Sequence, residues 1–229
     1  VSTSNAGTTG VSGLLKFRTG TTSSGASGAL LIASGSATSG KAGDLIMSVG
    51  VTNTGLGGEI QFTAGQSSAA NQAGGLIQMT GGTGSSSTLG AGGDVMIDGG
   101  VGSTNTGGYV SLTSGVGTIK SSGSIVIRSA NAGTLGVSGG LVFESGTTSS
   151  GSSGSVQLFS GAATHGKSGD ILVSVGTGTT GVGGDISIAS GTTTASSTGG
   201  FMSLTAGKGT TTSSGSVILR TSNAGTLGT

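Results

Sequence analysis

Pairs of large apolar residues, separated by one residue, recur along the whole chain. Fourteen such pairs follow one another at intervals of 15 to 18 residues, most often 15. Alternation with a period of two predicts an extended strand with one buried face. The near-constant interval predicts similar structural modules arranged in a row. The pairs are Leu15/Phe17, Leu30/Ile32, Leu45/Met47, Ile60/Phe62, Ile77/Met79, Val95/Ile97, Val110/Leu112, Ile125/Ile127, Leu141/Phe143, Val156/Leu158, Ile171/Val173, Ile186/Ile188, Met202/Leu204 and Val217/Leu219.

A unit of 15 residues is too short for a strand and a helix, but it fits one turn of a narrow coil. The pattern therefore predicts an all-β fold: a β-solenoid of about fourteen coils of about 15 residues, without helices, over residues 1–229. Glycines at the strand ends would form the corners. Segments such as 21–25 would form the return path, and each coil would bond to the coils above and below it. We expect the apolar pairs to point inward.

A longer repeat is superimposed on the short one. Asn5-Ala6-Gly7-Thr8 recurs at residues 131–134 and again at residues 223–226. This divides the single array into a block of eight coils over 5–130, a block of six coils over 131–222, and the start of a further block at 223–229. Gain or loss of a coil is tolerated in a stack where each coil contacts only its neighbours. We interpret the chain as a window cut from a longer repetitive protein.

The composition excludes several classes of protein. Gly, Ser and Thr make up more than half of the chain, and there is no Pro, Cys or Trp. Long helices, collagen and disulfide-bonded folds are therefore excluded. Eight cationic and seven anionic side chains are scattered singly, so there is no basic stripe for a nucleic acid. No apolar run approaches the length of a membrane span.

Two glycine-rich strings match the motifs of nucleotide-binding sites. Residues 161–168 match the phosphate-binding loop GxxxxGK[ST], and residues 176–181 match GxGxxG. Both motifs require a helix that begins directly after the glycines. Residues 169–173 instead have the pattern of a strand. We therefore expect no cofactor site.

The residues that could support catalysis or bind a metal are sparse. Ser138 lies in the string GxSxG, but the only histidine, His165, is two coils away, so we predict that the chain is not an enzyme. Acidic residues recur at strand entries, and Lys41 and Lys167 lie three residues before two of them, Asp44 and Asp170. We expect solvated charges there, with no metal site; a structural calcium ion is the alternative. The remaining acids in this position are Glu59, Asp94 and Asp185.

Two kinds of side chain suggest surface interactions. Thr-x-Thr occurs at Thr52/Thr54, Thr104/Thr106, Thr177/Thr179, Thr192/Thr194 and Thr210/Thr212, which resembles the threonine arrays of ice-binding solenoids of insects. The many Ser and Thr residues could also carry O-linked glycans. Large apolar residues on the outward side of the predicted strands form a stripe, and a soluble monomer rarely leaves such a stripe bare. We call Val126, Val142, Phe159 and Leu172 the apolar stripe and predict that it mediates self-association; cover by another part of the protein is the alternative.

The chain as a whole resembles short-coil β-solenoid (β-helix) repeat proteins, and its composition resembles Gly/Ser/Thr-rich secreted surface and fibre proteins. The resemblance implies a structural protein, extracellular or at the cell surface. Such a protein would form or decorate a filament, sheath or surface layer by coil stacking and lateral self-association. Its main partner would be itself, through end-to-end and lateral contacts. The alternatives are an ice-binding solenoid, or the stalk of an adhesin whose functional part lies outside this segment.

Overall fold

The computed structural model describes residues 1–86 and 88–222, and over these residues it contains neither an α-helix nor a β-strand. The chain divides into two compact units, Val1–Gly123 and Ser124–Thr229. The predicted start of a further block at 223–229 lies outside the described residues. No described segment is a helix, and so none could cross a membrane as an apolar helix.

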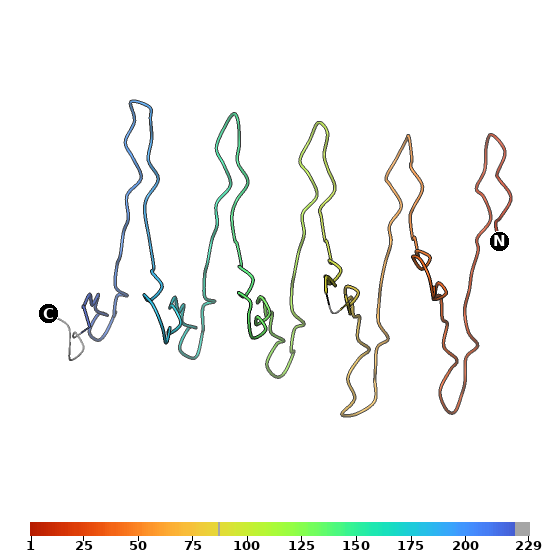
Figure 1. Ribbon diagram of the computed structural model, residues 1–229, viewed down its shortest axis with the longest axis horizontal. Helices are drawn as coiled ribbons and strands as arrows, with labels where there is room; N and C mark the ends of the chain where they lie inside the picture. Colours follow the sequence, from red (N-terminus) through yellow and green to blue (C-terminus); the bar gives the residue numbers. More distant parts are fainter. Residues whose placement is uncertain (87, 223–229) are drawn as a thin grey trace. The chain divides into compact units, whose positions relative to one another are not determined.

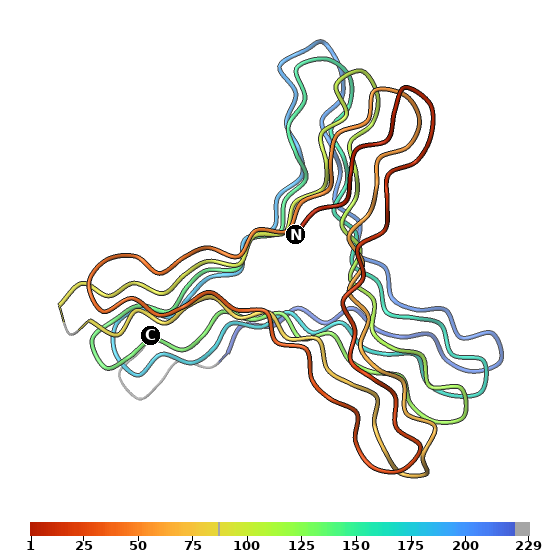
Figure 2. The same ribbon diagram turned by 90° about the vertical axis from the view of Figure 1, so that its right-hand side faces the viewer.

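Each unit is a succession of long loops. Figure 1 shows the chain running out and back repeatedly, and Figure 2 shows that successive loops within a unit point in different directions. The apolar pairs lie on the extended segments that link one Ser/Thr/Gly loop to the next. The bends fall in the Ser/Thr/Gly segments, as at residues 38–40 and 103–105.

Backbone hydrogen bonds between glycines close several loops at their base. The N–H of Gly108 donates to the carbonyl of Gly100 with an N···O distance of 2.8 Å, and the N–H of Gly123 donates to that of Gly115 at 2.9 Å. A Cβ on Gly99 would overlap the backbone of Gly108, so the two sides approach more closely than another residue would permit. The Ser/Thr/Gly segment therefore folds back on itself.

This arrangement contradicts the predicted β-solenoid. A solenoid requires hydrogen bonds between residues about one coil apart, whereas the backbone bonds that close the loops join residues 8 to 11 apart. The glycines predicted as separate corners instead face each other across one loop, so no sheet forms between successive coils in the described residues. The all-β fold class and the resemblance to β-solenoid and β-helix proteins are therefore wrong for this structure.

The predicted core is also absent, because no hydrophobic residue among those described is buried. The chain exposes 22516 Å² of surface, whereas a compact protein of 21.1 kDa exposes about 9000 Å². The apolar pairs were expected to point inward, but without a facing sheet they remain in solvent. Leu45 and Met47, for example, are 59% and 60% exposed.

The period of two nevertheless persists in the exposure of the side chains. Ile46, between Leu45 and Met47, is 80% exposed, and Val126 is more exposed than Ile125 and Ile127 on either side of it. In an extended backbone successive side chains point to opposite sides. The pattern is therefore visible as a difference in exposure between neighbouring side chains, but the strands with one buried face that it predicted do not form in the described residues.

Candidate functional site

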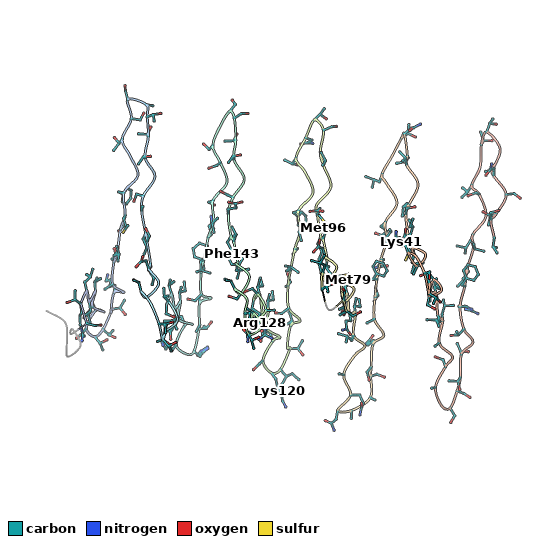
Figure 3. The ribbon with its side chains drawn as sticks, viewed as in Figure 1. Lys41, Met79, Met96, Lys120, Arg128 and Phe143 are labelled. Atoms are coloured by element: carbon teal, nitrogen blue, oxygen red, sulfur yellow. The ribbon has the colours of Figure 1, made fainter. Side chains whose placement is uncertain are left out.

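The main candidate for a functional surface is the set of extended apolar segments. The members of the apolar stripe are highly exposed, from 76% for Val126 and Val142 to 86% for Leu172. Figure 3 shows Met79, Met96 and Phe143 on such extended segments. Large apolar surface in water is unfavourable by about 25 cal/mol per Å², so these segments favour any partner that removes them from solvent.

The backbone of these segments is also available for bonding. Within residues 1–86 and 88–222, the backbone–backbone hydrogen bonds involve loop residues and no member of an apolar pair. An unpaired extended segment presents N–H and C=O groups that can pair with another extended chain. Each segment therefore offers two complementary means of association, apolar side chains and free backbone groups.

The loop tips are stabilised by hydroxyl groups that bond to their own backbone. Thr22 Oγ1 donates to the carbonyl of Ser24 at 2.8 Å, and Thr148 Oγ1 donates to that of Ser150 at 2.9 Å. The same bond occurs at a predicted Thr-x-Thr site, where Thr52 Oγ1 donates to the carbonyl of Thr54 at 2.9 Å. A hydroxyl committed to its own turn is less available to ice, so this geometry does not favour the ice-binding alternative.

Lys41 and Lys167 each form an ion pair with the aspartate three residues later. Lys41 Nζ lies 2.8 Å from Asp44 Oδ1, and Lys167 Nζ lies 2.8 Å from Asp170 Oδ1. All four side chains are exposed, so each pair is a solvated surface ion pair of small energetic value. In the part of the chain that the structure describes, no three His, Asp or Glu residues gather as a metal site would require.

The strings that match catalytic and nucleotide-binding motifs are not assembled into sites. No helix follows residues 161–168, so the amide groups needed to hold a phosphate are not gathered there. Ser138 and His165 take no part in the side-chain hydrogen bonds found among the described residues. A hollow of about 260 Å³ is lined by Arg128, Ser129, Ala130 and Asn131. These are four consecutive residues, and no group from another segment converges on them.

Sequence reasoning missed the close approach at the base of the loops, which joins two glycines in several of them. The signal was present as a Gly or small residue on each side of most Ser/Thr/Gly segments. At the loop between Ser34 and Gly43, a Cβ on the glycine would lie 3.6 Å from the Cβ of Ser34. Two small residues separated as Ser34 and Gly43 are can stand at the base of one narrow loop. The same spacing is equally compatible with two separate corners, so the sequence does not decide between them.

Comparison of the chain with models of protein families, with curated proteins and with solved structures found no match. The function therefore has to be argued from the surface of this chain.

Proposed function

We propose that this chain is a structural protein, extracellular or at the cell surface, whose copies associate to form or decorate a filament, sheath or surface layer. The observation that carries the proposal is the exposure of every large apolar side chain among the described residues. Ordering a chain costs about 1–2 kcal/mol per residue in backbone entropy, and burial of apolar surface is the main force that offsets it. A chain without its own core gains that burial by association.

The charges of the chain support the same proposal. The formal net charge is +1 over 229 residues, so little long-range repulsion opposes the approach of a second copy. The repeats support it further, because each of fourteen apolar segments offers a similar surface. Many weak, similar contacts along one chain strengthen one another once the first has formed. The Gly/Ser/Thr-rich composition is the basis for an extracellular location.

The proposal is tested by removing apolar side chains from the apolar stripe. We expect Phe159→Ser with Leu172→Ser to shift association to higher concentration, measured by sedimentation velocity over a concentration series. The matched control is Leu135→Ser with Val182→Ser, which removes two fully exposed apolar residues that lie at or next to the bends of the loops and not on the extended segments. We expect the control to associate as the wild type does.

Two results would contradict the proposal. A wild-type chain that sediments as a dispersed monomer at every concentration would exclude assembly. A dispersed monomer that arrests the growth of ice crystals would establish the ice-binding alternative in its place.

A further inference from the structure

Two loops of the chain are equivalent in sequence and in structure but carry opposite charges. Leu15 and Phe17 are followed by Arg18 and then by Gly20-Thr21-Thr22-Ser23-Ser24-Gly25. Leu141 and Phe143 are followed by Glu144 and then by Gly146-Thr147-Thr148-Ser149-Ser150-Gly151. Position 18 of the first loop therefore corresponds to position 144 of the second, at a separation of 126 residues.

The local geometry of the two loops is also the same. The N–H of Ser24 donates to Thr22 Oγ1 and that of Ser150 to Thr148 Oγ1, both at 3.3 Å. The glycines that end the two turns have similar positive φ angles, 99° for Gly25 and 101° for Gly151. At the base of the loops, a Cβ on Gly28 would lie 3.6 Å from Thr19, and one on Gly154 would lie 3.5 Å from Ser145.

The two opposite charges are exposed and take part in neither of the ion pairs found among the described residues. Arg18 and Glu144 are both exposed, and the ion pairs there are Lys41–Asp44 and Lys167–Asp170. Two copies aligned at the same residue numbers would place Arg18 beside Arg18 and Glu144 beside Glu144. A shift of one copy by 126 residues instead places Arg18 beside Glu144.

The neighbouring charges favour the shifted arrangement overall. Residues 15–62 carry three cationic and two anionic side chains, whereas residues 141–188 carry one cationic and three anionic side chains. The shift still places three pairs of like charges side by side, Lys41 with Lys167, Asp44 with Asp170 and Glu59 with Asp185, whereas unshifted copies place like charges together at every charged position. The shift also brings two neutral Lys–Asp pairs together, so that each lysine can approach the aspartate of the other copy. Opposite net charge sets the register of an interface more than its strength.

We propose that a second copy of this chain docks in parallel with a shift of 126 residues, so that residues 15–62 of one copy lie beside residues 141–188 of the next and Arg18 pairs with Glu144. This inference rests on the proposed function, because it names the partner and register of the same association. Each copy uses a different surface to bind its two neighbours. Such a head-to-tail contact grows into an open filament unless its rotation closes a ring.

Disulfide trapping tests this register because the chain has no cysteine of its own. Thr21→Cys and Thr147→Cys are made in separate full-length chains, which keeps Arg18 and Glu144 in place. Chains that exchange backbone hydrogen bonds lie about 5 Å apart, within the reach of a disulfide. We expect an oxidised mixture to yield mainly the mixed disulfide between the two variants, identified by mass spectrometry. Each variant alone should yield little.

Charge reversal in the same assay tests the pair itself. Adding Arg18→Glu to the Thr21→Cys chain should lower the mixed product about two- to fivefold, the range expected for an exposed pair. Adding Glu144→Arg to the Thr147→Cys chain should then restore it. The matched control, Arg128→Glu in the Thr21→Cys chain, lies outside both docking ranges and should change nothing.

Two outcomes would overturn the inference, and they can be told apart. Dominant disulfides between identical variants, in chains that still assemble, would show copies aligned without a shift and leave the proposed function intact. No disulfide in any mixture, together with sedimentation as a monomer, would overturn both this inference and the proposed function.

Discussion

Threonine hydroxyls at the loop tips show how single residues set the local conformation of this chain. Thr148 Oγ1 both donates to the carbonyl of Ser150 and accepts from its N–H. Thr22 makes the same two bonds with Ser24. Such side-chain hydrogen bonds satisfy backbone groups within a turn, and they compete with the hydrogen bonds of a helix or sheet. They help to explain why a segment rich in Ser and Thr bends back on itself.

Replacing Thr148 should therefore loosen the tip of its loop. We expect Thr148→Val to destabilise the turn by about 1 kcal/mol, because the valine keeps the shape but removes the hydroxyl. Faster hydrogen exchange of the Ser150 amide is the measurement. Thr147→Val is the matched control, since no hydrogen bond is found for the Thr147 side chain, and its exchange should match the wild type. Equal exchange rates in the two variants would refute this role of Thr148.

Individual residues were partly predictable from the sequence. Lys41 and Lys167 were noted three residues before Asp44 and Asp170, and the structure shows that each lysine pairs with its aspartate. Positive φ is found at Gly25 and Gly151, which lie in the segments predicted to form the return path and not at the strand ends where the corner glycines were expected. The burial of the apolar pairs was predicted wrongly. The alternation of large apolar residues shows that the two sides of a segment differ in hydrophobicity. It does not show what the apolar side packs against.

The loops are the repeated structural elements of the chain, and their narrow bases depend on glycine. Gly99 has the backbone of Gly108 where a Cβ would lie, whereas the adjacent Gly100 has open space around it. Gly100 also accepts the hydrogen bond from Gly108 through its carbonyl, which a side chain would not alter. These neighbouring glycines therefore have different tolerance for substitution.

Substitution at this loop base should open it. We expect Gly99→Ala to separate the two sides and to weaken the bond from Gly108 to Gly100, with a loss of about 1 kcal/mol. Hydrogen exchange at the Gly108 amide should then rise about fivefold. Gly100→Ala, the control, should leave the exchange rate close to that of the wild type. A larger effect from Gly100→Ala would show that the close approach is assigned to the wrong glycine.

The positions of the apolar segments and of the Ser/Thr/Gly segments between them could be read from the sequence, but their predicted conformation as strands and corners was wrong. A period of two fixes an extended backbone around Leu45 and Met47, and Gly with Ser and Thr fixes the bends. Neither the period of two nor the Gly/Ser/Thr composition determines how Gly100 and Gly108 are arranged. Two such glycines can lie at two distant corners or at the base of one closed loop. That choice depends on whether the next segment pairs with its predecessor, and no local pattern encodes it.

At the scale of the whole molecule, the main feature is apolar surface that the chain does not bury in its own fold. The members of the apolar stripe are exposed, but so is every other large apolar residue described, so their exposure does not single out the predicted stripe. The sequence did not reveal that the apolar pairs opposite the stripe share this exposure. Both sides of the extended segments are therefore available to a partner, and an association that removes this surface from water has to cover both.

Association that buries apolar surface should respond to solvent in a characteristic way. We expect assembly to strengthen on warming from the cold to room temperature, because apolar burial weakens on cooling. Sulfate should strengthen it further, since this salt is excluded from protein surfaces. Sodium chloride should have only a modest effect, because few charges take part. Light scattering over a temperature series provides the measurement, and dissociation in sulfate would contradict an apolar interface.

Small-angle X-ray scattering over a concentration series tests most directly whether the chain lacks a core of its own. It yields molecular mass and radius of gyration together. A compact chain of 229 residues has a radius of gyration of about 17 Å. We predict a value well above this for the 21.1 kDa monomer at low concentration, and masses of two or more chains as the concentration rises. A 21.1 kDa particle with a radius near 17 Å at every concentration would show that the chain buries its apolar residues alone, and would contradict the account.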